Sequence, residues 1–556
     1  MSVPASQVQS LAQMPGVFAV VPDTLMYADF TADPTYDFAG MRDSREALNI
    51  GEIHEAGITG DGVVVGVLDT GIDYNHPDLK SVYKGGWNFI TAGADHNVRQ
   101  RADSDPMETT YEQWQRSGQP EVNSKGSEYY TSHGTHVSGT IAAQAANGDG
   151  TYKALGLAPD VDLYVARVLG PYGSGATSGI VAAIDDFAAA GGNLPKADVI
   201  NLSLGADNDT AYGVDVYALN NAVIAGVNVA VSAGNNAGAT TADRKTYTLG
   251  TPGTAYLPVT VAASQYGGTA VKTYDAATAA AGENSASFGL LIEGMDIRNT
   301  FADGKIEGTP APVYVEGKGY EAYLAFGPND TNPQLTDLQA IPDGSLAGKV
   351  LFVKRGLAFT DFLAQAKRTG AGALVIVNNV ANGEKYITNM AIGGANKDHL
   401  PIFSAFHSTS AKLTGLAASG TVYVQLGTLA TAAQAYEPAY FSSIGPVTET
   451  TGLKPDIIAP GWSIVSTQPA FITNPDHNTT DYDGAYASMS GTSMSAPHMA
   501  GILALMKQQY PNATPAEIKA RLMNTATHDK IKALADGTPA SVLEVGAGFV
   551  NPYRAL

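Results

Sequence analysis

Cysteine is absent from this chain of 556 residues. The absence excludes a thiol nucleophile, a thiolate-bound metal and a disulfide framework, so the sequence carries no record of the redox state of its surroundings. Charged residues are scarce at 15%, and 53 acidic against 32 basic residues give a formal net charge of −21. Because nucleic-acid binding needs clustered Lys and Arg, we expect no nucleic-acid partner.

Long apolar runs are also missing. No stretch of about 18 apolar residues occurs, so we expect no membrane-spanning helix and no membrane partner. The first residues lack the basic and apolar regions of a signal peptide. Apolar residues still make up 44% of the chain, and its length exceeds what one hydrophobic core usually serves. We therefore expect two or three folded domains.

Short apolar runs rich in β-branched residues alternate with helical patterns from residue 61 onward. Such runs are typical of parallel strands buried on both faces, and they occur at 63–68, 163–169, 199–204 and 227–231. Between them, apolar residues recur at helical spacing, as in Ile180, Ile184 and Phe187. The pattern predicts an α/β fold with a doubly wound, mostly parallel sheet, in which sites form beyond the carboxyl ends of the strands.

The alternation stops after residue 263 and resumes at residue 440. The residues between have their own strand, helix and strand patterns, at 348–356, 359–369 and 370–379. We therefore predict a β-rich domain at 265–434, inserted into an α/β domain formed by 31–264 and 435–556.

A second insertion, at 91–130, is polar and rich in Gly, Asp and Glu. We interpret it as a surface loop. Its acidic residues Asp103, Asp105 and Glu108 are interpreted as solvated.

Three segments each combine a reactive side chain with small residues. Asp69 follows a predicted buried strand in Leu-Asp69-Thr-Gly, His133 opens a helical segment in Ser-His133-Gly-Thr, and Ser493 lies in Gly-Thr-Ser493-Met. We expect Pro497, just beyond, in the first turn of an apolar helix. A serine hydroxyl needs an imidazole to take its proton, and the imidazole needs a buried carboxylate, so these three residue types suit nucleophilic catalysis.

A developing oxyanion needs hydrogen-bond donors, and the N-terminus of a helix supplies some of them. A second donor is expected from Asn235, in Ser-Ala-Gly-Asn235 after another predicted strand. A turn residue tolerant of unusual backbone angles is the alternative for Asn235. Five further polar residues near these motifs are interpreted as hydrogen-bonded or structural supports: His76, His136, His498, Ser490 and Ser495.

The motifs and their order, Asp, His, Ser, resemble those of the subtilisin-like serine proteases, or subtilases. The resemblance covers residues 50–264 and 435–556. It implies that Asp69 orients and stabilises the imidazole, His133 acts as general base and then acid, Ser493 is the nucleophile and Asn235 donates to the oxyanion. It also implies a secreted, monomeric serine endopeptidase that acts on proteins or peptides.

The resemblance further implies a groove in which substrate adds as a β-strand. One edge is expected at Gly173, Ser174 and Gly175, and the opposite edge at Ser203, Leu204 and Gly205. The pocket for the side chain before the cut is expected at Ser232, Ala233, Gly234 and Gly250. Because none of these residues is charged, we predict a preference for large apolar or aromatic side chains.

Two more segments resemble parts of larger subtilases. The insertion resembles the protease-associated domain through Lys354-Arg-Gly and Leu400-Pro-Ile. Residues 11–23 resemble the end of a propeptide. We therefore expect a propeptide remnant or N-terminal arm at 1–30, with a propeptide inhibitor as a further partner.

A structural calcium site is also expected from the resemblance. Calcium takes several oxygen ligands, and Asp78, Asn147 and Asp149 are the candidates. An ordinary turn of Asn, Asp and Gly is the alternative. For the whole chain, two further hypotheses stay open: a processing peptidase dedicated to one protein, and a binding protein whose inserted domain makes the contacts.

Overall fold

The chain divides into two compact units in the structure, which is a computed structural model. Unit 1 consists of Met1–Asp33, Gly40–Gln265 and Tyr436–Leu556, and unit 2 of Pro34–Ala39 and Tyr266–Ala435. The structure describes residues 7–17, 20–21, 23–28, 31–32, 40–90, 102–147, 155–207, 210–238, 243–266, 271–278, 285–292, 319–326, 334–379, 400, 402–405, 407–418, 420–430, 436–474, 476–528, 531 and 539–556.

The largest sheet of unit 1 has eight strands among the described residues. Their order is β18-β10-β9-β7-β3-β5-β4, with β19 paired to β10, and the pairs from β10 to β4 are parallel. The strands are β3 (Val64–Asp69), β4 (Tyr83–Asn88), β5 (Asp162–Arg167), β7 (Val199–Leu202), β9 (Asn228–Ser232), β10 (Val259–Tyr266), β18 (Tyr436–Pro438) and β19 (Ile457–Pro460). The predicted α/β fold with a mostly parallel sheet is confirmed.

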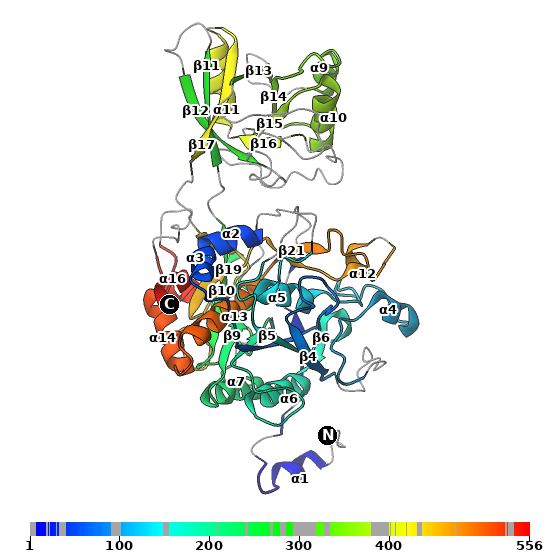
Figure 1. The fold of residues 1–556 in the computed structure, drawn as a ribbon, viewed down its shortest axis with the longest axis vertical. Coiled ribbons are helices and arrows are strands. Elements are labelled where there is room, and N and C mark those ends of the chain that lie inside the picture. The colour runs from blue at the N-terminus through cyan, green and yellow to red at the C-terminus, as the bar shows by residue number, and fades with distance from the viewer. Residues whose placement is uncertain are drawn as a thin grey trace. The chain divides into compact units, whose positions relative to one another are not determined.

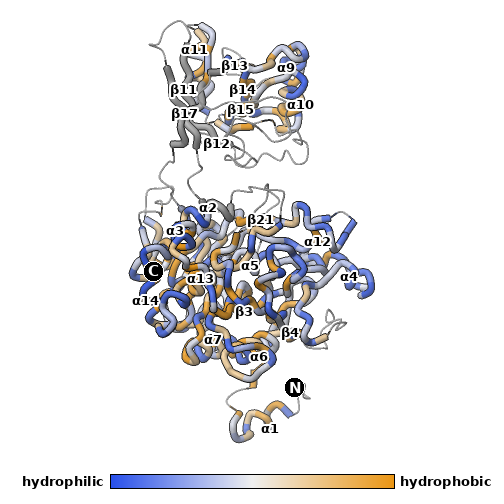
Figure 2. The backbone as a smooth tube through the Cα atoms, in the orientation of Figure 1, coloured by the Kyte–Doolittle hydropathy of each residue, from blue (hydrophilic) through white to orange (hydrophobic). Residues whose placement is uncertain are grey.

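Helices cover both faces of this sheet. On one face α5 (His133–Ala142) packs against α13 (Thr492–Gln509), and on the other α6 (Thr177–Ala188) packs against α7 (Val214–Ile224) (Figure 1). The residues of β3 are mostly hydrophobic, whereas those of outer helices such as α14 (Pro515–Thr525) are mostly hydrophilic (Figure 2). α13 is buried from Thr492 to Met506, as expected of a helix with apolar or small residues all around.

Two small sheets of unit 1 use strands from the beginning of the chain. In the first, β1 (Leu25–Ala28) lies between β6 (Ser174–Ala176) and β8 (Leu204–Gly205). In the second, β2 (Thr31–Ala32) pairs with β21 (Tyr486–Ser490), which also pairs with β20 (Ile464–Thr467). The N-terminal segment, which carries β1 and β2, thus contributes strands to two sheets of unit 1. The shorter helices of the unit are α1 (Val8–Ala12), α2 (Gly40–Ala47), α3 (Ile50–Glu55), α12 (Ala470–Thr473), α15 (Val542–Val545) and α16 (Pro552–Ala555).

The insertion at 91–130 differs from the expected surface loop in its described part, residues 102–130. It forms α4 (Tyr111–Ser117), which Thr110 begins with a capping box. Glu108, Thr109 and Tyr129 are 0%, 1% and 0% exposed. The interpretation of Glu108 as a solvated carboxylate is therefore wrong, because the segment folds onto the sheet instead of projecting into solvent.

Unit 2 contains a closed barrel of strands. Their order among the described residues is β11-β12-β16-β15-β14-β13-β17, and the pairs from β13 to β16 are parallel. The strands are β11 (Val271–Thr278), β12 (Ser285–Ile292), β13 (Gly319–Ala325), β14 (Val350–Lys354), β15 (Ala373–Val377), β16 (Ile402–Ala405) and β17 (Val422–Ala430), with helices α9 (Leu335–Gln339), α10 (Phe359–Thr369) and α11 (Ser408–Ala417). The resemblance of this unit to a protease-associated domain stays a prediction.

None of the helices in the described part of the chain is both long and apolar enough to cross a membrane.

Candidate active site

Asp69 and His133 form a buried hydrogen-bonded pair. Asp69 is the last residue of β3, at the carboxyl end of a central strand. Its Oδ1 accepts the backbone N–H of Thr70 at 2.7 Å and lies 2.7 Å from Nδ1 of His133. The two side chains are 0% and 1% exposed. A carboxylate in this position favours the tautomer with its proton on Nδ1, which leaves Nε2 as the basic nitrogen.

The helix that carries His133 is fixed at its N-terminus by other segments. His133 is the first residue of α5, and the preceding Ser132 makes no side-chain capping bond. Instead, the N–H of Gly134 donates to Thr70 Oγ1 at 2.8 Å, and the N–H of Thr135 donates to Glu108 Oε1 at 2.9 Å. These bonds satisfy donors that a helix leaves unpaired in its first turn. They also tie α5 to the turn that follows Asp69.

Ser493 is the second residue of α13, which packs directly against α5. The Oγ of Ser493 donates to the carbonyl oxygen of Ser203 at 3.0 Å. The side chain therefore lies beside β8, the strand that begins one residue after Ser203. The position at the start of a buried helix places the hydroxyl near backbone N–H groups and the positive end of the helix dipole.

Pro497 lies inside α13 instead of in its first turn, so that expectation is wrong. A proline at this position cannot donate to the carbonyl oxygen four residues earlier, which belongs to Ser493. The Oγ of Ser203 donates to that oxygen at 2.8 Å. Ser203 and Ser493 are thus joined twice, each side chain donating to the other's carbonyl oxygen.

Asn235 lies just beyond the end of β9, next to the start of α13. Its Oδ1 accepts the N–H and the hydroxyl of Thr492, each at 3.0 Å. The same hydroxyl accepts the N–H of Gly234 at 3.2 Å. Because the carbonyl end of the amide is held by Thr492, the Nδ2 end is directed elsewhere as a donor. Thr492 directly precedes Ser493, so the amide is anchored beside Ser493.

Both predicted edges of the substrate groove are strands, and β1 lies between them. Gly173 ends a short 3-10 turn, Ser174 and Gly175 belong to β6, and Ser203 precedes the two residues of β8, Leu204 and Gly205. The register pairs Met26 with Gly175 and Tyr27 with both Ser174 and Gly205, always antiparallel. A segment of the chain itself therefore occupies the predicted groove.

The four residues predicted for the adjoining pocket lie together around the end of β9. Ser232 donates from its Oγ to the carbonyl oxygen of Leu204 at 3.3 Å, and the N–H of Gly250 donates to the carbonyl oxygen of Ala233 at 3.0 Å. Gly234 has a φ of +103°, a backbone conformation that favours glycine. No charged side chain is among these residues.

A comparison with known families matches residues 60–548 to the Subtilase family. The chain belongs to the subtilase family. It is 32% identical to the Minor extracellular protease Vpr of Bacillus subtilis (strain 168), over all of this chain and 60% of that protein. It is 28% identical to Subtilisin-like protease SBT1.2 of Arabidopsis thaliana, over 99% of this chain and 68% of the relative. A PII-type proteinase of Lactococcus lactis subsp. cremoris is 29% identical over 89% of this chain and 25% of its own length.

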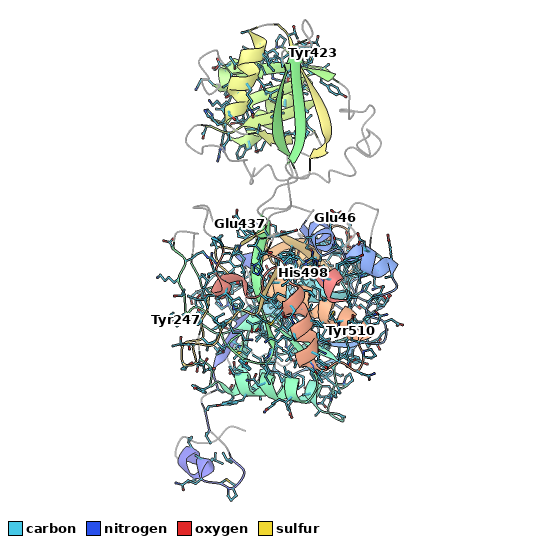
Figure 3. All side chains as sticks on the ribbon, turned by 90° about the vertical axis from the view of Figure 1, so that its left-hand side faces the viewer. Glu46, Tyr247, Tyr423, Glu437, His498 and Tyr510 are labelled. Atoms are coloured by element: carbon cyan, nitrogen blue, oxygen red, sulfur yellow. The ribbon has the colours of Figure 1, made fainter. Side chains whose placement is uncertain are left out.

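Three other histidines of this subtilase are hydrogen-bonded supports, as interpreted from the sequence. Nε2 of His136 donates to the carbonyl oxygen of Ile464 at 2.9 Å, and burial lowers its pKa to about 3. His498 lies inside unit 1 (Figure 3), where Nδ1 donates to Met494 O, and burial lowers its pKa to about 4. His76 is likewise buried, which lowers its pKa. All three imidazoles are therefore neutral near pH 7.

Two of the predicted calcium ligands of the subtilase, Asp78 and Asn147, belong to one hydrogen-bonded cluster. Oδ1 of Asp78 accepts the N–H groups of Ala146 and Asn147, and Oδ2 accepts the hydroxyl of Tyr486 at 2.6 Å. The side chain of Asn147 donates to the carbonyl oxygen of Tyr482 at 2.7 Å. Asp78 and Asn147 are thus held in place by hydrogen bonds within the protein. Asp149 lies outside the described residues, and the calcium site stays a prediction.

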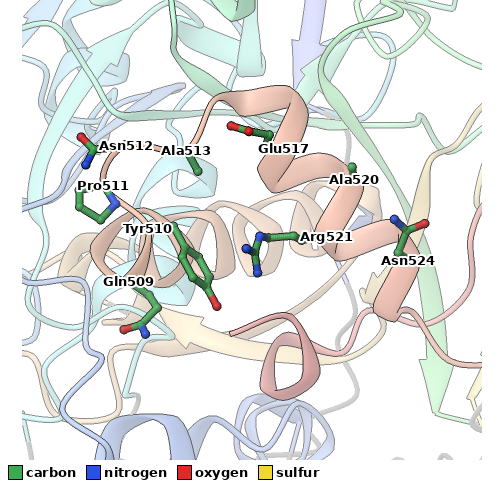
Figure 4. A pocket seen from close by; sticks show the side chains of 9 residues that line it. All are labelled: Gln509, Tyr510, Pro511, Asn512, Ala513, Glu517, Ala520, Arg521 and Asn524. Atoms are coloured by element: carbon green, nitrogen blue, oxygen red, sulfur yellow. The ribbon is translucent and has the colours of Figure 1, made fainter.

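A separate pocket lies between the end of α13 and α14, and none of the predicted site residues lines it (Figure 4). Inside it the guanidinium of Arg521 lies 4.2 Å from the ring centroid of Tyr510, whose hydroxyl donates to the carbonyl oxygen of Leu556. These contacts join the C-terminal helices, and we assign the pocket no chemistry. Its lining residues are Gln509, Tyr510, Pro511, Asn512, Ala513, Glu517, Ala520, Arg521 and Asn524.

Proposed function

We propose that this subtilase is a serine endopeptidase that hydrolyses peptide bonds through an acyl-enzyme on Ser493. The observation that carries the proposal is the buried pair of Asp69 and His133, whose Oδ1 and Nδ1 lie 2.7 Å apart. His133 begins α5, the helix that packs against the helix of Ser493. Asp69 holds the imidazole in one tautomer and stabilises the positive charge that it acquires.

In the first half-reaction, the hydroxyl of Ser493 gives up its bond to the Ser203 carbonyl oxygen. His133 Nε2 then takes its proton while the oxygen attacks the scissile carbonyl carbon. The imidazolium then gives the proton to the leaving amine as the C–N bond breaks. In the second half-reaction, water attacks the ester on Ser493, with His133 again as base and then acid. Water thereby releases the carboxylic acid and restores the serine hydroxyl.

The negative charge that develops on the carbonyl oxygen needs fixed donors. We assign them to the Nδ2 of Asn235 and to the backbone N–H of Ser493. Thr492 holds the opposite end of the Asn235 amide with two bonds of 3.0 Å. The donor is therefore oriented before substrate arrives, which is the condition under which such a group lowers the barrier most.

Substrates would be extended protein or peptide segments that pair with β6 and β8. β1 provides the example, because the same strands hold it by antiparallel pairing. Its side chains alternate: Met26 is 1% exposed and packs with the main apolar cluster of unit 1, while Leu25 is 42% exposed. A bound segment in this place would bury alternate side chains and leave the others in solvent.

The residue before the cut is predicted to be large and apolar or aromatic, because small uncharged residues form the predicted pocket. Digestion of a peptide library followed by sequencing of the products tests this. We expect most cuts after Leu, Met, Phe or Tyr. Abundant cuts after Lys or Arg would contradict the pocket assignment.

The N-terminal segment acts, in our proposal, as an internal inhibitor that must leave the groove before substrate enters. Burial of Met26 contributes about 1.5–3 kcal/mol to holding β1 in place. Met26→Asp would put a carboxylate among apolar side chains, so we expect the initial rate of peptide hydrolysis to rise at least about tenfold, since each 1.4 kcal/mol of weakened binding is a factor of 10.

The matched control is Leu25→Asp, at the neighbouring exposed position of the same strand. It should leave the initial rate at the wild-type value. Equal rates for wild type and Met26→Asp would show that β1 does not limit access to the groove.

Reaction with a fluorophosphonate probe tests the proposed enzyme class directly. The probe phosphonylates only a serine that a neighbouring base activates. We expect one adduct per chain, located by mass spectrometry on the peptide that contains Ser493. No adduct, or an adduct on another residue, would overturn the proposal.

Extracellular action is proposed from the name of the Bacillus relative, which describes that relative as an extracellular protease. We further propose that unit 2, the insertion between the segments carrying Asn235 and Ser493, is a protease-associated domain. Its closed barrel and its position in the chain support this assignment.

A further inference from the structure

We propose that Glu108 is a positioning residue of the protease: its carboxyl group joins the turn after Asp69 to the first turn of α5 and thereby fixes the Asp69–His133 pair. The inference rests on the proposed function. Glu108 would act through Thr70 and Thr135, on either side of the pair, and it comes from the insertion at 91–130.

The contacts of Glu108 connect three segments. Oε1 accepts the N–H of Thr135 at 2.9 Å and its hydroxyl at 3.0 Å, in the first turn of α5. Oε2 accepts the hydroxyl of Thr131 at 2.6 Å, just before that helix. The hydroxyl of Thr70, the residue after Asp69, completes the set. One carboxyl group therefore binds both elements that carry the Asp69–His133 pair.

The threonine hydroxyls are committed as donors toward Glu108. Each of them already accepts a backbone N–H: Thr131 from Thr109 at 2.9 Å, Thr135 from Asp73 at 2.9 Å, and Thr70 from Gly134 at 2.8 Å. Since each hydroxyl has one proton, that proton is left for the carboxyl oxygens. The site therefore presents hydroxyl and N–H protons to the carboxyl oxygens, and the NH₂ group of glutamine could not accept them.

The backbone next to Glu108 packs as closely as its side chain. The carbonyl oxygen of Pro106 accepts the N–H of Ile72 at 3.0 Å. A Cβ added to Gly71 would lie 2.5 Å from that oxygen and 2.9 Å from the N of Glu108, and Gly71 has a φ of +126°. Only glycine both adopts this backbone conformation readily and leaves room for the neighbouring backbone. The turn after Asp69 therefore allows the segment of Glu108 to pack closely against it.

The electrostatic surroundings show that burying the carboxyl group of Glu108 would be energetically unfavourable without these hydrogen-bond donors. The pKa of Glu108 is raised, mainly because the carboxyl group is completely buried. The hydrogen bonds from Thr131, Thr70 and Thr135 lower this pKa, and the nearby charge of Asp69 raises it by a smaller amount. Asp73 is a further carboxyl group close enough to interact with it. A buried carboxyl group beside two others is retained at a cost in stability, which fits a role in placing the triad.

The test compares full-length Glu108→Gln with wild type, using a peptide substrate and counting active sites by complete reaction with the fluorophosphonate. Glutamine keeps the size of the side chain but presents an NH₂ group to hydroxyl protons. We expect kcat per labelled site to fall about 10- to 100-fold with KM within about twofold of wild type, as misplacement of a catalytic group produces. A merely structural role would lower the number of active sites and leave kcat per site unchanged.

The control is Glu112→Gln, in the same insertion, whose side chain is 67% exposed and pairs with Arg116. It should match wild type. Thr131→Val removes one donor to Glu108 with little change in volume, and we expect a smaller fall in kcat per site. If Glu108→Gln does not fold, Thr131→Val by itself tests the inference.

A kcat per site within twofold of wild type in the folded variants would overturn this inference. Failure of wild type to react with the fluorophosphonate would instead overturn the proposed function.

Discussion

Replacing Ser493 with alanine is expected to lower kcat for peptide hydrolysis by about 10⁶-fold, the size measured for the nucleophile of subtilisin, a member of this family. The reason is that no acyl-enzyme can form once Oγ is gone, and His133 then has no proton to take. Residual hydrolysis would come from the oxyanion donors and substrate binding alone. The measurement is the rate of product release from a chromogenic peptide at saturating concentration.

Ser495→Ala is the matched control for this prediction. Ser495 lies in the same turn of α13, and its Oγ donates to the carbonyl oxygen of Ala459 at 3.2 Å. Loss of that bond should cost about 1 kcal/mol of stability and leave kcat near the wild-type value. A loss of activity in Ser495→Ala with retention in Ser493→Ala would show that the nucleophile has been misassigned.

Replacing Asp69 with asparagine is expected to lower kcat by about 10⁴-fold, the effect of the same change in another serine protease. The asparagine amide fills the same space, yet it cannot stabilise the imidazolium as a carboxylate does. Oδ1 of Asp69 accepts from both Thr70 N–H and His133 Nδ1, so the amide oxygen of asparagine would keep these two bonds while the negative charge beside the imidazole is lost. A loss of about 10⁴ corresponds to about 5.5 kcal/mol in the barrier.

The measurement is kcat per active site, with the melting temperature recorded to separate catalysis from folding. Asp61→Asn is the control, since Asp61 is exposed just before β3. It should match wild type in both quantities. Activity of Asp69→Asn within tenfold of wild type would be incompatible with the proposed role of the carboxylate.

Much of the fold follows from local pattern. Buried parallel strands must be apolar on both faces, so β3, β5, β7 and β9 were predictable as short β-branched runs. Asp69, His133 and Ser493 each lie in a short motif with small residues, because a reactive side chain at the end of a strand or start of a helix needs neighbours without bulk. Family membership followed from these motifs and their order.

Other features were missed because they depend on contacts between distant residues. The sequence around Glu108 is polar and acidic, which is typical of a solvated loop, and its burial depends on Thr70, Thr131 and Thr135 meeting around one carboxyl group. Pro497 was expected in the first turn of its helix. Inside α13 it is tolerated because Ser203, 290 residues away along the chain, donates to the carbonyl oxygen of Ser493.

The sequence alone determined the parallel sheet, the family and the candidate catalytic residues, since hydrophobic period and short motifs are local properties. Only the tertiary structure decided that Glu108 is buried between the Asp69 turn and α5, and that Leu25–Ala28 lies between β6 and β8, in the predicted substrate groove. The physical reason is that a hydrogen bond or a strand pairing needs partners brought within about 3 Å, and distances of that kind are set by the packing of the whole domain.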